Sequence, residues 1–468
     1  MLFFRSLLIF ASLLVATYSQ ANTMDLEQRM LQMEQRLNAL ESRLLEKDER
    51  IEQQQQQIVE LESGTLSEQV VGPRDLSDEE KQALVTLANI EPILYRAQEK
   101  IGYHYGRPDR YIPIPGTNTS LDIGGHIWND IIYNDREMDN QAGFQPSSIP
   151  TVNQRRSNES TFSAGQSKLY FKTFTPTQWG DMNTRIEFDM WQEDGSSDFH
   201  LTHLWAELGP FGAGQTFSNF MDITSFPNII EYWGPNSMVF TRQSQVRYTH
   251  TLSDNTRIAI SLEDPHSDIT LPDGAPADGR EEWPDLALSY FTEGDWGHFR
   301  VGGLLRQISA EANDGSGRQD EDLGWGLNFT GSLNFGEQDR LVYQYAFGEG
   351  FARYMNDPCC SVVGGNDAAL DKNGNLKAID IAGGFVYWDH FWSKRWSTSI
   401  GASYAEIDPL AGQKNEAFDH GFYTSANLLW YPADPLKVGF ELIYGEVEDK
   451  IGRSSQNTRY VSSVSFKF

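Results

Sequence analysis

A strict alternation of side-chain character runs from about residue 120 to the end of the chain. One face of residues 436–445 is bulky and apolar, and it is made of Leu436, Val438, Phe440, Leu442 and Tyr444. Residues 396–405 repeat the pattern, with small side chains on the second face. A period of two is the period of a β-strand. Soluble sandwiches and propellers alternate in the same way, so this pattern alone predicts strands and leaves the fold open.

The number of strand candidates and their connections narrow the fold. The candidates lie near residues 120–133, 160–175, 183–193, 199–209, 211–217, 238–252, 256–263, 285–293, 297–309, 322–336, 339–349, 377–391, 394–406, 418–431, 436–446 and 456–468. Tight turns such as Gly209-Pro210 alternate with long acidic loops such as 264–284. An even number of strands, joined by short turns at one end and long loops at the other, is typical of outer-membrane barrels. We therefore predict an all-β transmembrane barrel of about 16 antiparallel strands over residues 120–468.

The last strand supports this prediction. Residues 460–468 carry aromatic side chains at alternating positions and end in Phe468, as the assembly signal of such barrels does. A barrel of this size is too wide for side chains to fill, so we expect an aqueous channel.

Composition excludes several other classes. The chain has 66 acidic and 37 basic residues and a net charge of −29. This excess disfavours a nucleic-acid partner, which would require a basic face. The mean hydropathy of −0.49 disfavours a helical membrane protein. Solvent-exposed loops and a water-filled lumen would account for the polar composition of the chain.

The first residues have the features of an export signal. Arg5 precedes the apolar stretch 7–16, and Ser19-Gln20-Ala21 offers small residues for cleavage. We predict a signal peptide over residues 1–21, since the apolar stretch is too short for a membrane anchor. The cysteines, Cys359 and Cys360, are adjacent, which suits a local vicinal disulfide better than a disulfide framework.

Residues 22–63 follow a heptad repeat. The repeat positions are Leu26, Met30, Met33, Leu37, Leu40, Leu44, Lys47, Ile51, Gln54, Ile58 and Leu61. A single amphipathic helix would drift from this 3.5-residue period, so we predict a periplasmic coiled coil that joins protomers. Residues 64–119 are predicted to be a linker with a short helix near 77–100.

Three segments together resemble one family. Residues 211–222 (FGAGQTFSNFMD) are followed by 231–235 (EYWGP) and 242–248 (RQSQVRY). These segments resemble the DcaP-like porins, which are trimeric dicarboxylate channels, at the entry to and exit from their third loop. The resemblance implies a homotrimer in the outer membrane of Gram-negative bacteria, in contact with lipid and lipopolysaccharide, that passes small anionic solutes.

The alternation also predicts which charges face the lumen, because a basic side chain facing lipid at mid-depth costs about 2–4 kcal/mol. The predicted pore-lining basic residues are Lys168, Lys172, Arg185, Arg242, Arg247, Arg257, Arg300 and Arg306. Asp222 and Glu231 are the acidic residues predicted on the third loop. A basic wall opposite an acidic loop would create a transverse field that selects solutes. Alternatively, the arginines pair with Glu187, Asp189 and Glu263 and keep the lumen wet.

We find no pattern that predicts catalysis, a metal site or a cofactor. His200 and His203 are expected on opposite faces of their strand, where they could not chelate one metal. The sequence 371–375 (DKNGN) begins like a calcium loop but lacks its final acid, so a tight turn is favoured. Two functions remain open, a diffusion channel for small organic acids and a structural protein that tethers the membrane through its coiled coil.

Overall fold

The computed structural model describes residues 112–154, 157–270, 277–312, 319–358 and 366–468. The chain divides into two units, 1–82 and 83–468, and every described residue lies in the second. The predicted signal peptide, coiled coil, most of the linker and both cysteines lie outside the described residues. Within the described ranges, no helix is long and apolar enough to cross a bilayer.

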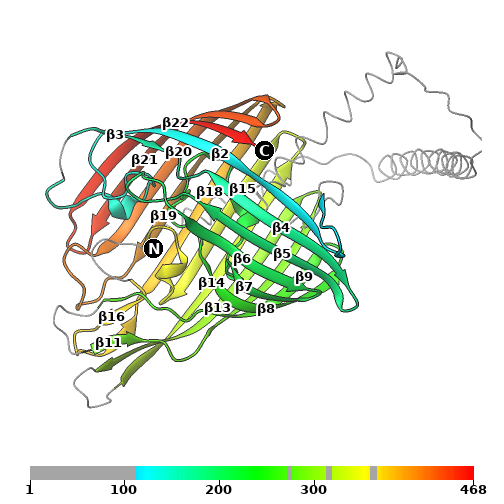
Figure 1. Ribbon diagram of the computed structural model, residues 1–468. Coiled ribbons are helices and arrows are strands. Elements are labelled where there is room, and N and C mark those ends of the chain that lie inside the picture. The colour runs from blue at the N-terminus through cyan, green and yellow to red at the C-terminus, as the bar shows by residue number, and fades with distance from the viewer. Residues whose placement is uncertain (1–111, 155–156, 271–276, 313–318, 359–365) are drawn as a thin grey trace, which may run out of the picture. The chain divides into compact units, whose positions relative to one another are not determined.

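Sixteen antiparallel strands of the described residues close into a barrel (Figure 1). They are β2 (Ser120–Asn134), β4 (Lys168–Thr177), β5 (Gly180–Asp189), β6 (His200–Leu208), β7 (Phe211–Phe217), β8 (Arg242–Ser253), β9 (Thr256–Glu263), β12 (Asp285–Gly294), β13 (Gly297–Ala312), β14 (Gln319–Phe335), β15 (Asp339–Glu349), β18 (Asp380–Ser393), β19 (Trp396–Ile407), β20 (Phe418–Ala433), β21 (Leu436–Asp449) and β22 (Ser454–Lys467). Each strand pairs with the next one, and β22 pairs back with β2, with Ile127 opposite Phe466. The predicted barrel of about 16 strands is therefore confirmed.

Six short strands lie outside this ring. β1 (Ile112–Pro113), β3 (Glu159–Ser163) and β11 (Ala277–Arg280) extend the barrel sheet, whereas β10 (Ile269–Thr270), β16 (Ala368–Leu370) and β17 (Leu376–Ala378) form a separate small sheet. The 3₁₀ turns are η2 (Pro146–Ser148), η3 (Ile223–Ser225) and η4 (Ala352–Tyr354). The strand expected at 160–175 is in fact two strands, because β3 pairs with the end of β2 and β4 with its beginning.

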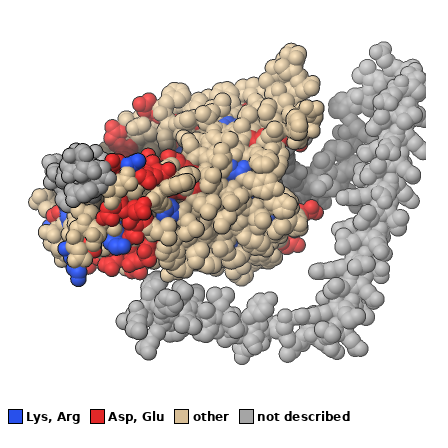
Figure 2. Space-filling view, turned by 90° about the horizontal axis from the view of Figure 1, so that it is seen from below, with Lys and Arg blue, Asp and Glu red and all other residues tan. Residues whose placement is uncertain are grey.

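The outer face of the wall is apolar. Ile186, Ile260 and Phe440 are exposed on it, in alternation with buried inward residues. Exposed aromatic residues mark the short turns at one end, with Trp179 between β4 and β5 and Trp296 between β12 and β13. Figure 2 shows a broad uncharged belt over the strands and charged residues gathered at the other end. Short turns and an apolar belt with aromatic edges place the turns on the periplasmic side.

The barrel interior contains a packed apolar core, which the alternation did not predict. It is formed by loops that fold inward, chiefly residues 218–241 between β7 and β8, with 135–154 and 350–358. Its buried members include Phe144, Phe220, Ile230, Met238, Phe351 and Tyr354, and inward Tyr387, Tyr423 and Leu429 of the wall. The expected open lumen is therefore partly filled, by inserted loops that pack against inward side chains of the wall.

Glycines on the inner wall make room for this core. A Cβ atom at Gly326 of β14 would lie 2.9 Å from Cζ of Phe220. One at Gly445 of β21 would lie 2.5 Å from Cε1 of Phe144. At these positions only a glycine lets a loop aromatic ring approach the wall this closely.

Candidate functional site

Loop 218–241 is tied to the inner wall along its whole length. Near its start, the side-chain amide of Asn219 donates to the carbonyls of Ala259 on β9 and Ala287 on β12. In the middle, the amide of Asn228 donates to Ser397 on β19. Later, the amide of Asn236 donates to the carbonyl of Gly421 on β20. The loop therefore crosses the lumen and contacts both sides of the wall.

Asp222 lies at the beginning of this loop and is 2% exposed. Its carboxylate accepts hydrogen bonds from the backbone N–H of Thr224 at 3.0 Å and from Oγ1 of Thr330 at 2.6 Å. Its Oδ2 also lies 3.0 Å from Nε2 of His298. Burial acts to raise the pKa of Asp222, but the neighbouring His298 and Arg300 hold that pKa well below its usual value. Asp222 therefore anchors the loop to β13 and β14 as a carboxylate.

Glu231 lies further along the loop and is 4% exposed. Its two carboxylate oxygens accept hydrogen bonds from the backbone N–H groups of Phe144 at 2.8 Å and Gly234 at 2.6 Å. Burial raises the pKa of Glu231 to about 7. Both predicted acids thus lie on the inserted loop, but their side chains hold it in place. Of the two, Asp222 also borders the cavity between the start of the loop and the wall, whereas Glu231 does not.

A cavity of about 630 Å³ lies between the start of the loop and the wall strands β6 to β13. Arg247, Arg257 and Arg300, three of the predicted pore-lining residues, all line it. They come from β8, β9 and β13. In the wall, β8 lies beside β9, and β12 lies between β9 and β13. The alternation pointed each of them inward, and the curvature of the wall brings them together.

Two of these arginines flank one aromatic ring. Phe291 of β12 is paired in register with Arg257 on one side and Arg300 on the other. The guanidinium of Arg257 lies 3.7 Å from the centre of the Phe291 ring. Nη2 of Arg300 donates to the carbonyl of Asn219 at 2.7 Å. These contacts fix the positions of the two guanidinium groups at the cavity.

The third arginine is held in a similar way. Arg247 donates from Nε and Nη2 to the side-chain oxygen of Gln245, and from Nη2 to the carbonyl of Phe217. Its guanidinium also lies 5.6 Å from the centre of a Trp205 ring. Among the described residues, no carboxylate pairs with Arg247, so its positive charge is available to a solute.

The other predicted basic residues have different surroundings. Lys168 and Arg185 both pair with Glu187, at 2.8 and 2.5 Å, which confirms the alternative of internal ion pairs for that acid. Lys172 lies 4.4 Å from the centre of the Tyr170 ring. Arg242, at the start of β8, lies over the rings of Phe217 and Phe240. The two other predicted acidic partners bind polar groups, with Asp189 held by His200 and Tyr232, and Glu263 by Gln243 and Asn219.

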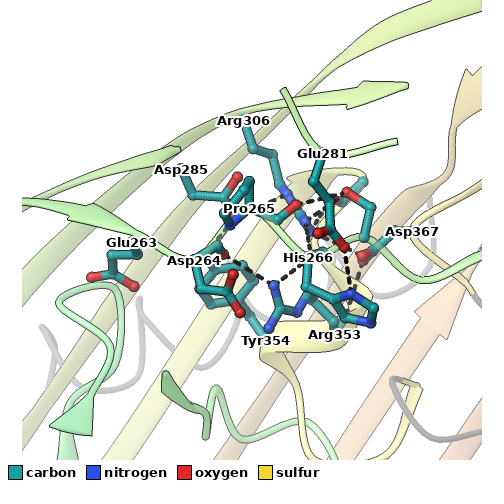
Figure 3. A network of polar contacts seen from close by, with 12 residues as sticks. Glu263, Asp264, Pro265, His266, Glu281, Asp285, Arg306, Arg353, Tyr354 and Asp367 are labelled. Atoms are coloured by element: carbon teal, nitrogen blue, oxygen red, sulfur yellow. Dashed lines mark hydrogen bonds and ion pairs between the residues drawn. The ribbon is translucent and has the colours of Figure 1, made fainter. Parts of the chain in front are cut away.

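Arg306 does not line the channel, contrary to the prediction. It is 2% exposed, and it pairs with Asp285 at 3.3 Å and with Asp367 at 2.9 Å (Figure 3). Asp367 also accepts from the backbone N–H of Arg353, whose guanidinium donates to the carbonyls of Asp264 and His266. The network joins the loop after β9 to the loop after β15. An inward position on β13 was predicted correctly, but Asp285 of the neighbouring β12 and Asp367 of a distant loop bury the side chain.

The expected separation of His200 and His203 is also wrong. A β-bulge in the pairing of β5 with β6 shifts the register between Glu187 and Phe188. His200 therefore reaches Asp189, and His203 reaches Oγ1 of Thr216 from a buried position on the same inner side. A bulge adds one residue to a strand and reverses the facing of those beyond it.

Comparison with known proteins identifies the family. The sequence matches the family described as DcaP outer membrane protein over residues 54–460. The chain belongs to the DcaP outer membrane protein family. The outer membrane is therefore its location, which confirms that prediction. No curated protein matches the sequence.

Solved structures agree with the fold of this DcaP-family protein. The crystal structure of the outer membrane channel DcaP of Acinetobacter baumannii is similar with a TM-score of 0.65 and 17% identity, over 76% of this chain and 99% of that one. An anion-selective porin from Comamonas acidovorans is similar with a TM-score of 0.50 and 8% identity, over 75% of this chain and 100% of that one. At these identities the similarity establishes a shared porin fold.

Two residues of the cavity in this DcaP-family protein were missed by the sequence reasoning. Phe291 follows Tyr290, which is exposed on the outer face, so one ring of this adjacent pair has to point inward. Trp205 lies between Leu204 and Ala206, which both face outward. An aromatic residue at an inward position of the alternation was the available signal for both.

Proposed function

We propose that this DcaP-family protein is a diffusion channel for small anionic organic acids, with dicarboxylates among them, and that it works as a homotrimer. The single observation that carries the proposal is the cavity lined by Arg247, Arg257 and Arg300. The proposal is of a channel and not of an enzyme, since passage through the cavity requires that a solute bind and leave unchanged.

The arrangement of the arginines suits carboxylates. A guanidinium offers a planar pair of donors that matches a carboxylate. Arg257 and Arg300 lie on either side of Phe291, so their Cα atoms are two strand spacings, or about 10 Å, apart. A solute with two carboxylates can therefore approach two cations above an apolar floor.

The rest of the lumen supports this route for anions. The packed loop core fills part of the lumen, and Lys168, Arg185 and Arg306 are paired with carboxylates. Basic side chains that line a water-filled passage with low-dielectric walls raise the local concentration of anions. The net charge of −29 belongs to the whole chain and does not describe this passage.

The test is ion selectivity in planar bilayers. Arg247→Ala and Arg300→Ala should each lower the anion-to-cation permeability ratio about two- to fivefold, as expected for loss of one partly solvated charge. Arg280→Ala is the matched control, because Arg280 pairs with Glu282 and Glu311 in the loop region away from the cavity. Unchanged reversal potentials in both cavity variants would refute the proposal. A purified trimer that is inert in liposome swelling would favour the structural tether instead.

A further inference from the structure

The cavity also contains an acid placed opposite one of its arginines. Glu207 of β6 pairs in register with Gly212 of β7, and Gly212 pairs in register with Arg247 of β8. Both charged side chains line the cavity. The carboxylate of Glu207 and the guanidinium of Arg247 thus face the same cavity from one row of register-paired residues, which we call a rung. Gly212 lies between them.

Trp205 occupies the space above that glycine and keeps the two charges apart. A Cβ atom at Gly212 would lie 2.1 Å from Cζ2 of Trp205, so the ring rests directly on the backbone there. The indole N–H donates to Oε1 of Glu207 at 2.8 Å, and the guanidinium of Arg247 lies 5.6 Å from the centre of a Trp205 ring. Among the described residues, Glu207 and Arg247 form no ion pair with each other. Each charge is oriented by the ring and neither is neutralised by the other.

We propose that Glu207, Trp205 and Arg247 form a recognition site for the ammonium and carboxylate groups of an amino acid, and that acidic amino acids are a preferred class of solute. This inference rests on the proposed anion channel and specifies what it passes. Glu207 binds the ammonium group through its carboxylate, which accepts one hydrogen bond from Trp205 and has further acceptor capacity. Arg247 binds the α-carboxylate through Nη1, because its Nε and Nη2 donate to Gln245 and Phe217.

The other two arginines form a second site for carboxylates. Arg257 lies four residues along β9 from Ser261, the register partner of Arg247. Four strand residues span about 13 Å, so the rung of Arg257 and Arg300 is a separate station nearer the periplasmic turns. A neutral amino acid fits the first station alone, and a plain dicarboxylate fits the second. An acidic amino acid interacts favourably with both in turn.

A simpler role for Glu207 makes a different prediction. If Glu207 only weakens the attraction for anions, its neutralisation speeds every anionic solute. If Glu207 binds ammonium, its neutralisation slows the solutes that carry that group. Glutamate and glutarate separate the two cases, because both have a five-carbon dicarboxylate skeleton and glutamate adds an ammonium group.

The experiment compares the permeation of glutamate and glutarate by liposome swelling with the purified full-length protein. Glu207→Gln keeps an oxygen that can accept from Trp205, and we expect the glutamate-to-glutarate ratio to fall about three- to fivefold, with slower entry of glutamate itself. Glu293→Gln is the matched control, since Glu293 lines the same cavity away from this rung. It should affect the two solutes alike.

An equal gain for both solutes in Glu207→Gln, or no change, overturns the inference. The proposed anion channel fails on a different result, namely unchanged reversal potentials in the arginine variants. A heat-modifiable oligomer on gels verifies that each variant is assembled before its ratio is interpreted.

Discussion

Phe220 offers a sharp test of whether loop 218–241 is held by packing. The side chain is 0% exposed, and its ring meets those of Phe351 and Tyr354 edge-to-face, with centroid distances of 5.6 and 5.8 Å. On the wall side it lies against Gly302 and Gly326. Phe220→Ala therefore leaves a void between the loop and the barrel.

The expected cost follows from the size of that void. Replacing a buried phenylalanine with alanine costs about 3–5 kcal/mol, and the two edge-to-face pairs are lost within that sum. The strands keep their backbone ladder, so the cost falls on the attachment of the loop and not on barrel closure. A loss of about 4 kcal/mol raises the population of the detached loop about a thousandfold.

Single-channel recording and amide hydrogen exchange measure this effect. We expect Phe220→Ala to show larger and noisier open-channel currents and faster exchange of amides in residues 219–231, with the oligomer intact on gels. Phe440→Ala is the control, since Phe440 is 50% exposed on the lipid-facing side of β21. Wild-type conductance together with wild-type exchange in Phe220→Ala would show that packing of this ring does not hold the loop.

Two further predictions concern buried charges. Because burial raises the pKa of Glu231 from 4.5 to about 7, the folded loop takes up a proton that the unfolded chain releases between these values. Glu231 therefore favours the attached loop most below pH 4.5, and this contribution of about 3 kcal/mol is lost as pH rises toward 7. Hydrogen exchange of the loop should be faster at pH 8 than at pH 5.5 after correction for intrinsic rates, and Glu231→Gln should abolish the difference. Arg306→Met should lower the free energy of unfolding by about 3–5 kcal/mol, because it strands two buried carboxylates. Adding Asp367→Asn should restore part of the thermal stability, and a double variant no more stable than Arg306→Met would contradict the ion-pair account.

Much of the fold could be predicted because it depends on local patterns. The alternation in residues 436–445 sets the facing of β21, and the tight turns set which strands are neighbours. The same alternation placed Arg247, Arg257 and Arg300 on the inner face, since lipid excludes their charge. The sequences of the interior loops show no such alternation of apolar and polar residues. Phe220 and Phe144 became core residues only because glycines far away in the sequence, Gly326 and Gly445, lie opposite them.

By itself, then, the sequence determined that this chain forms a sixteen-stranded barrel and which side of each strand faces lipid, because both follow from a period of two and from the cost of charge in a bilayer. Only the tertiary structure decided which inward arginines are buried in ion pairs with carboxylates. Arg306 and Arg247 looked alike along the chain, yet Arg306 meets Asp367 across 61 residues and Arg247 meets the ring of Trp205. Partners that come from other strands and loops cannot be read from local spacing, and it is these partners that separate a structural ion pair from a site for a solute.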